Sequence, residues 1–138
     1  MKRGKFIAGN WQMNKGAAES LAFLVKLISL LEKVKEIESR VPDPVNVALF
    51  PQAINLLSMG EYLRNSKINI KLGIQNIHWQ LSGAFTGENS IKSAVEAGSS
   101  FALVGHSERR HLFQEGNDII SKKFTSCLEN GLKPVLCV

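Results

Sequence analysis

The sequence predicts an α/β fold in which parallel strands alternate with helices. Five short apolar segments of strand length recur along the chain, and segments with helical periodicity separate most of them. Gly, Pro, Asn or Asp stand at most of the boundaries. Strands that alternate with helices pair in parallel through right-handed crossovers. An open doubly wound sheet and part of a barrel both satisfy this alternation, and periodicity does not choose between them.

Length and composition indicate one globular domain, residues 1–138, with 44% hydrophobic and 21% charged residues. The formal net charge of +5 comes from scattered Lys and Arg residues. A nucleic-acid groove needs a denser basic stripe, so no nucleic-acid partner is expected. No apolar run reaches membrane-spanning length, so no membrane association is expected. Cys127 and Cys137 lack metal-ligand neighbours, which predicts a cytoplasmic protein with reduced thiols and no metal site.

A short strand and a long helix open the chain. Residues 6–9 are apolar and run into the polar loop Asn10 to Gly16, which predicts a buried strand. From Ala17 onward, apolar residues at spacings of three and four predict an amphipathic helix. Its expected inward positions are Leu21, Leu24, Val25, Ile28, Leu31 and Val34. The segment Pro42-Asp43-Pro44 excludes a helix and predicts a turn.

The second and third strands flank a shorter helix. Residues 45–50, VNVALF, predict a buried strand that Pro51 stops. Residues 53–63 predict a helix whose expected inward residues are Ile54 and Leu57, with Leu56 as a further candidate. Residues 68–74 predict the third strand.

A long loop, residues 75–90, follows the third strand. It exceeds a simple connection and carries Gly83 and Gly87, which is typical of a functional or interface loop, while a plain solvated loop is the alternative. Residues 91–97 predict a helix, with Ser90 as its N-cap and Gly98 as its stop.

The fourth strand, residues 101–104, ends in a concentration of polar side chains. Gly105 allows a turn, and HSERR follows at residues 106–110. Parallel α/β folds carry their chemistry where strands end, so a functional site is predicted here. A structural, hydrogen-bonded role is the alternative for His106. Residues 119–128 predict another helix and residues 134–138 a fifth strand.

Four segments, in this order and spacing, resemble the triosephosphate isomerase family: AGNWQMN at 8–14, GAFTGENS at 83–90, LVGHSERR at 103–110 and PVLCV at 134–138. The family fold is an eight-stranded β/α barrel of about 250 residues. The resemblance therefore implies a partial TIM barrel, four βα units and a fifth strand in one parallel sheet. An unrelated α/β protein that binds a phosphorylated small molecule is the alternative.

The family interconverts dihydroxyacetone phosphate and glyceraldehyde 3-phosphate, a step of glycolysis and gluconeogenesis, without a cofactor. The resemblance implies that His106 is the electrophile that polarises the carbonyl, with Asn10 and Glu108 as further catalytic residues. It also implies that Asn10 and Gln12 bind a triose phosphate. The residues after His106 can open a short helix, whose amide groups would disfavour the imidazolium.

Two departures from the family predict that this chain alone lacks isomerase activity. Gln12 stands where the family has the lysine that meets the substrate phosphate and the developing oxyanion. Hydrogen bonds to charged groups contribute about 1.5 to 3 kcal/mol against about 1 kcal/mol for neutral ones, so the change costs orders of magnitude in rate. Lys15 is not expected to replace this cation. The family's catalytic glutamate and phosphate-binding loops lie beyond the fifth strand, with which the sequence ends.

The resemblance also implies a homo-oligomer, most simply a dimer. In the family the third loop reaches the neighbouring subunit, so Thr86 would approach Asn10 of the partner subunit and Glu88 would face Arg109 of the partner subunit. A non-catalytic module that assembles through the free edges of its first and fifth strands is the alternative. The residues expected to pack are Trp11, Trp79 and Cys137, and those expected at the surface or in caps are His78 and His111.

Overall fold

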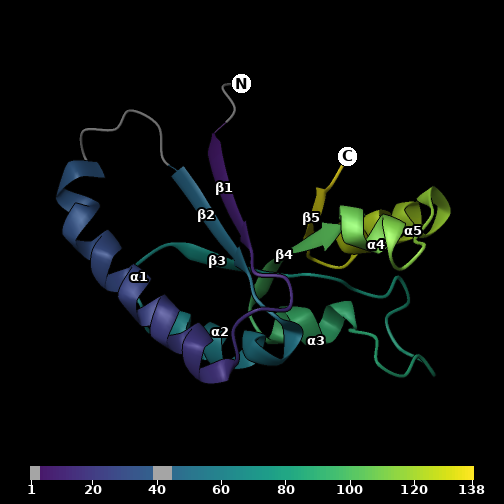
Figure 1. Ribbon diagram of the computed structural model, residues 1–138, viewed down its shortest axis with the longest axis horizontal. Helices are drawn as coiled ribbons and strands as arrows, with labels where there is room; N and C mark the ends of the chain where they lie inside the picture. The colour runs from purple at the N-terminus through teal and green to yellow at the C-terminus, as the bar shows by residue number, and fades with distance from the viewer. Residues whose placement is uncertain (1–3, 39–44) are drawn as a thin grey trace.

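The computed structural model describes residues 4–38 and 45–138, in which five parallel strands form one curved sheet (Figure 1). The strands are β1 (Lys5–Asn10), β2 (Val45–Phe50), β3 (Ile70–Ile74), β4 (Ser99–Val104) and β5 (Lys133–Leu136). Their order in the sheet, β1-β2-β3-β4-β5, is their order in the chain. In a doubly wound sheet the order of the strands reverses at a switch point, whereas in this sheet the order does not reverse. The strand order therefore selects the partial barrel over the open sheet.

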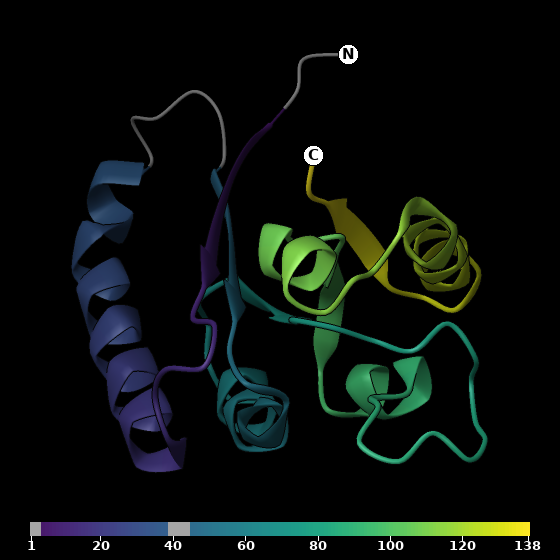
Figure 2. The same cartoon turned by 45° about the vertical axis from the view of Figure 1, so that its right-hand side comes forward.

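The helices cover the convex side of this sheet. They are α1 (Ala17–Glu38), α2 (Leu56–Arg64) after the 3-10 turn η1 (Ala53–Asn55), α3 (Ile91–Glu96), α4 (Ser107–His111) and α5 (Asn117–Glu129). Figure 2 shows α1, α2, α3 and α5 around the outside of the strands, while the short α4 lies apart from them, directly after β4. None of the helices in the described ranges is long and apolar enough to cross a membrane.

Side chains on the two faces of the sheet form two apolar clusters. The larger one lies between sheet and helices and includes Leu24, Met59 and Leu72. The smaller one, on the concave face, consists of Ala48, Phe50 and Leu103, with Phe101, Val135 and Cys137 packed against it. Neighbouring residues of β2 divide between the faces because side chains alternate along a strand. The concave face is the side that the rest of a closed barrel would cover.

The inward face of α2 differs from the prediction. Ile54 and Leu57 are exposed, at 83% and 55%, whereas Leu56 and Met59 are buried. The residues that face the core, Ala53, Leu56, Met59 and Leu63, recur at spacings of three and four and form one helical face, so Ile54 and Leu57 lie on the other face. In α1, burial of Leu24 and Ile28 is confirmed, but Val25 and Val34 are exposed, so the prediction for these two valines is wrong.

Local hydrogen bonds determine where some of the helices and strands begin. Ser90 Oγ accepts the N–H of Ser93 at 3.1 Å, which confirms the N-cap of α3, and Gly98 follows that helix with a φ of 97°. β3 begins at Ile70 rather than residue 68, because the N–H of Ile68 donates to Ser66 Oγ in the preceding turn. β5 spans Lys133–Leu136, one residue earlier than predicted at its start. The predicted turn at residues 42–44 lies outside the described residues.

Of the two positions expected for His78, the surface one is wrong, whereas a capping role fits the N–H of Gln80, which His78 Nδ1 accepts at 3.0 Å. His78 is buried, and its ring stacks between Trp79 and Phe85, with centroids 4.1 Å and 4.0 Å away. His111 is exposed and Trp11 is buried, as predicted. The rings around His78 give the long loop a packed base.

Candidate active site

The carboxyl ends of three strands meet at one hollow of about 210 Å³. β1 ends at Asn10, Gln75 follows β3, and His106 follows β4. The lining residues are Asn10, Gln12, Met13, Gln75, Asn76, Leu103, His106, Glu108, Arg109 and Phe113. The fold thus brings together five predicted residues from two distant segments. Thr86 and Glu88 do not line this hollow and are exposed on the loop of residues 75–90.

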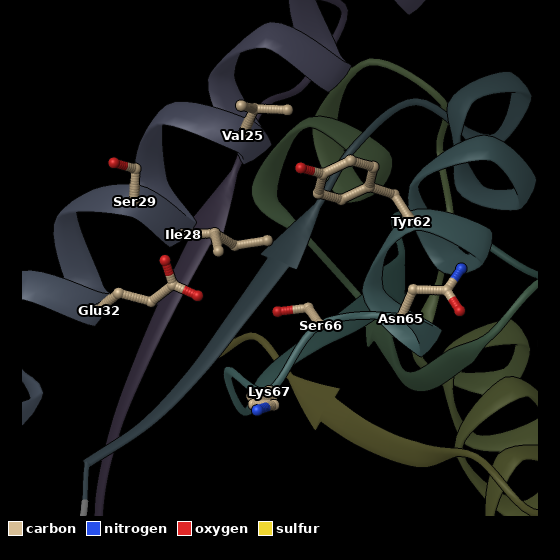
Figure 3. A pocket seen from close by; sticks show the side chains of 8 residues that line it. All are labelled: Val25, Ile28, Ser29, Glu32, Tyr62, Asn65, Ser66 and Lys67. Carbon is tan, nitrogen blue, oxygen red and sulfur yellow. The ribbon is translucent and has the colours of Figure 1, made fainter.

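A larger hollow, of about 600 Å³, lies between α1 and α2 on the outside of the sheet (Figure 3). Val25 and Ile28 of α1 lie across from Tyr62 of α2. Ser66 and Lys67 close it near the amino end of β3, away from the strand ends that carry Asn10 and His106. It contains none of the predicted site residues, so size does not identify the site.

Three hydrogen bonds fix the loop that carries Gln12. Gln12 has a φ of 52°, an uncommon value for a residue with a side chain. Its N–H donates to Asn10 Oδ1 at 3.1 Å, and its carbonyl accepts from Gln75 Nε2 at 2.9 Å. The Gln75 amide also donates to the carbonyl of Phe50 at 2.7 Å. Sequence reasoning missed Gln75, for which the available signal was its place directly after a buried strand.

Gln12 contacts Glu108 across the hollow. Its amide Nε2 donates to Glu108 Oε1 at 2.6 Å, and Glu108 Oε2 lies 3.4 Å from His106 Nδ1. The predicted short helix after His106 is confirmed as α4. His106 occupies the N-cap position of α4, but its side chain makes no capping hydrogen bond. The Glu108 carboxylate thus lies between the Gln12 amide and the His106 imidazole.

Arg110 ties the turn after β4 to the end of β5. Its Nε donates to the carbonyl of Gly105 at 2.7 Å, and its Nη2 donates to the carbonyl of Cys137 at 3.1 Å. Gly105 has a φ of 73°, and a Cβ there would lie 2.9 Å from the Arg110 guanidinium. A side chain at residue 105 would thus disturb both the turn and this link.

Beneath the hollow, Glu115 joins two cations. Its Oε1 accepts from Arg109 Nε and Nη2, at 2.9 and 2.6 Å, and from Lys123 Nζ at 2.6 Å. Burial raises the pKa of Glu115, but hydrogen bonds and charge from Lys123 and Arg109 outweigh it and lower the pKa overall. Lys123 also donates to Asn76 Oδ1 at 2.6 Å. Sequence reasoning missed Glu115 and Lys123, because nothing in the helical pattern separates Lys123 from exposed lysines.

Lys15 does not line the hollow. Its ammonium lies 5.7 Å and 5.2 Å from the ring centroids of Trp11 and Phe23. The charged residues that line the hollow are Glu108 and Arg109, and the Arg109 guanidinium is paired with Glu115. In the described ranges, no three His, Cys, Asp or Glu side chains are grouped so that they could hold a metal ion.

Residues 5–138 match the family model described as triosephosphate isomerase. The chain belongs to the triosephosphate isomerase family. It is 38% identical to the triosephosphate isomerase of Aquifex aeolicus, over 97% of this chain and 50% of that protein. It is 41% identical to the triosephosphate isomerase of Alkaliphilus metalliredigens, over 99% of this chain and 50% of that protein.

The crystal structure of triosephosphate isomerase from Bartonella henselae superposes with a TM-score of 0.75 at 32% identity, over 97% of this chain and 51% of that chain. The chain thus spans about half the length of the triosephosphate isomerases it matches. The resemblance to the N-terminal half of the family barrel is confirmed, and the alternative of an unrelated α/β protein is excluded.

Proposed function

We propose that this chain supplies the electrophile side of a triosephosphate isomerase site. The convergence of Asn10, His106 and Glu108 at the ends of β1 and β4 carries the proposal. His106 polarises the carbonyl of a triose phosphate, Asn10 orients the substrate, and Glu108 acts beside the imidazole. The reaction moves a carbon-bound proton by acid–base chemistry, which these side-chain types serve without a cofactor.

The proposed site needs a base and a cation that the hollow does not supply. A base must remove the carbon-bound proton. By the family resemblance, this base is the catalytic glutamate, which lies in the half of the family barrel that this chain does not match. The phosphate and the developing oxyanion need positive charge. Gln12 has none, and Arg109 is engaged by Glu115. We therefore expect no turnover from this polypeptide alone.

A coupled isomerase assay tests the proposal. The chain is assayed alone and then with a separately expressed C-terminal half of a related triosephosphate isomerase. We expect no turnover alone, weak turnover with the added half, and at least tenfold more after Gln12→Lys, since a charged hydrogen bond that adds about 1.4 kcal/mol or more raises the rate by that factor. His106→Gln is the matched control and should abolish the turnover. If the chain alone showed isomerase activity, and His106→Gln abolished that activity, the need for a second half would be contradicted.

We also propose that two copies associate around this hollow in the cytoplasm. Met13 and Phe113 at its mouth are 89% and 60% exposed, so a second copy would cover apolar surface. Thr86 would then approach Asn10 of the partner subunit, and Glu88 would pair with Arg109 of the partner subunit. Both cysteines are free thiols, which supports a reducing compartment.

A non-catalytic, self-assembling half barrel is the second candidate. The favouring observation is apolar exposure at the two edge strands of the described sheet, where Ile7 of β1 is 59% exposed and Leu136 of β5 is 44% exposed. Unpaired strand edges pair readily. Two results together would favour this candidate over the enzyme. Ile7→Lys would abolish the association of the chain into oligomers, and the chain would show no turnover when a C-terminal half is added.

A further inference from the structure

We propose that Asn55 is a positioning residue that holds the β1–α1 loop, residues 11–16, in the shape that places Gln12 in the hollow. Asn55 is the N-cap residue of α2, lies outside the hollow and acts through the carbonyl of Lys15. The hold on the loop follows from contacts within this chain. Its consequence for catalysis rests on the proposed function.

The β1–α1 loop contains two residues in an unfavourable backbone conformation. Gln12 and Lys15 have φ values of 52° and 67°, and this left-handed conformation costs free energy in a residue with a side chain. It persists only where surrounding groups hold it. Gln75 holds the first of these residues, because its Nε2 donates to the carbonyl of Gln12 at 2.9 Å. Lys15 needs a donor of its own.

Asn55 supplies this donor from the connection between β2 and α2. Its Nδ2 donates to the carbonyl of Lys15 at 3.0 Å and to Ser20 Oγ at 3.0 Å. Asn55 and Ser20 are fully buried, and the low dielectric around them strengthens these bonds. Gln52, a partly exposed residue of the same connection, donates to the same carbonyl at 3.3 Å. The loop is thus held at Lys15 chiefly by Asn55.

The other contacts of Asn55 do not account for its burial. An N-cap Asn normally accepts an N–H from the first turn of its helix, but the side chain of Asn55 makes no capping bond. Within the described residues, its buried Oδ1 accepts no hydrogen bond, which costs free energy. An apolar side chain would avoid this cost, and the Lys15 carbonyl would keep its bonds from Gln52 and Ser20 Oγ, at 3.3 and 3.4 Å. The bond to the loop is therefore the contact that explains Asn55.

Backbone ¹⁵N relaxation of the full chain tests the inference directly. In the unsubstituted chain we expect order parameters of about 0.85 at Gln12 and Asn14, the value of a rigid backbone. In Asn55→Leu they should fall below about 0.6, while those of β2 and α2 stay unchanged and the midpoint of urea unfolding does not fall. A merely structural role would instead lower the midpoint and leave the loop rigid. Gln52→Ala should also lower the loop values, and it tests the hold on Lys15 if Asn55→Leu does not fold.

Ser20→Ala is the matched control for Asn55→Leu. It removes a buried hydroxyl from the same cluster and leaves the bond from Asn55 to Lys15 in place. The order parameters of its loop should stay near about 0.85. Equal loosening in Ser20→Ala would overturn the role of Asn55. A loop that is mobile in the unsubstituted chain, or that stays rigid in both Asn55→Leu and Gln52→Ala, would overturn it as well.

The complementation assay measures the consequence for the reaction. Gln12→Lys is expected to raise the complemented turnover at least tenfold, and adding Asn55→Leu should abolish that gain, because residue 12 no longer stays in place. The dissociation constant between the two halves should change less than about twofold, since Asn55 is buried within this half. An undiminished gain with a loosened loop would overturn the consequence for catalysis. Failure of complementation in the unsubstituted chain would count against the proposed function and leave the relaxation result standing.

Discussion

At the scale of single residues, one carboxylate oxygen beneath the hollow accepts hydrogen bonds from two cations. Glu115 is buried, and Lys123, which donates to it, is 3% exposed at its side chain. In the described part of the chain, the second oxygen, Oε2, has no hydrogen-bond partner. The single oxygen Oε1 thus carries the ion pairs of Glu115 with both Arg109 and Lys123.

We expect Glu115→Ala to lower the free energy of unfolding by about 3 to 5 kcal/mol, because it leaves Lys123 buried without its counter-charge. Urea denaturation at neutral pH measures this loss. Glu96→Ala is the matched control: Glu96 forms an exposed pair with Lys92 at 4.0 Å, and such pairs contribute about 0.5 kcal/mol or less. Similar losses in both variants would contradict the assignment of a buried charge cluster.

The same carboxylate predicts a dependence of stability on pH. Lys123 and Arg109 lower the pKa of Glu115 below its ordinary value of 4.5 despite burial. A lowered pKa means that the stabilisation is present above 4.5 and is lost as the pH falls through the folded-state value. We therefore expect a smaller loss of unfolding free energy between pH 6 and about pH 3 in Glu115→Gln than in the unsubstituted chain. Equal losses in urea titrations would show that other carboxylates control acid unfolding.

The resemblance to the family predicted part of the lining of the hollow and missed the residues that support it. Asn10, Gln12, His106 and Glu108 were predicted because they stand in the motifs that carry the resemblance, and all of them line the hollow. The supporting contacts join residues far apart in sequence: Gln75 to Gln12 over 63 positions, and Lys123 to Asn76 over 47. These contacts form only when the chain has folded, so no local sequence pattern predicts them.

At the scale of elements, α2 shows that apolar periodicity alone does not choose which face of a helix is buried. Residues 53–63 carry apolar side chains on two faces, and the prediction placed Ile54 and Leu57 inward. In the structure the face with Ala53, Leu56, Met59 and Leu63 packs on the core, while Ile54 and Leu57 are exposed. Element types and order were predictable, whereas the buried face of α2 depends on its packing against the sheet and its neighbours.

The contact between α2 and the end of α3 gives a prediction with an unusual sign. Gly→Ala within a helix normally stabilises by about 1 kcal/mol. Gly60 of α2 is buried, and a Cβ there would collide with the backbone carbonyl of Ala97. We expect Gly60→Ala to destabilise the fold by about 1 to 3 kcal/mol, since the two elements must move apart.

Gly16→Ala is the control for Gly60→Ala. A Cβ at Gly16, just before α1, would meet nothing within 4 Å. Its effect on the midpoint of urea unfolding should therefore be small. If Gly60→Ala raised the midpoint, the close packing of α2 on residue 97 would be contradicted.

At the scale of the whole molecule, the strand order explains why apolar surface is available for association with a second polypeptide. A sheet that runs β1 to β5 without reversal curves in one direction and leaves two edges and a concave face within the described residues. Phe6, on the edge strand, is 42% exposed although its ring lies 5.1 Å from that of Phe101. The family barrel closes with strands that this half does not contain, so apolar surface remains accessible at the edges as well as around the hollow.

The edge strands and the surface around the hollow would form two different dimers. Reversing the charge of a residue in one interface distinguishes them. If copies associate around the hollow, Glu88→Arg places a cation against Arg109 of the partner subunit. Like charges that face each other across an interface cost several kcal/mol, so the dissociation constant should rise at least tenfold, which corresponds to about 1.4 kcal/mol. Sedimentation velocity over a range of micromolar concentrations measures this change.

Glu96→Arg is the matched control for Glu88→Arg, because it makes the same change of charge on an exposed residue of α3, away from the loop. It should leave the dissociation constant within about twofold of the unsubstituted chain, since Glu96 and its exposed partner Lys92 lie on α3 and an exposed ion pair contributes little. If Ile7→Lys dissociates the dimer while Glu88→Arg does not, association occurs through the edge strand instead. A monomer in the unsubstituted chain at these concentrations would contradict both arrangements, because neither leaves its apolar surface open to water.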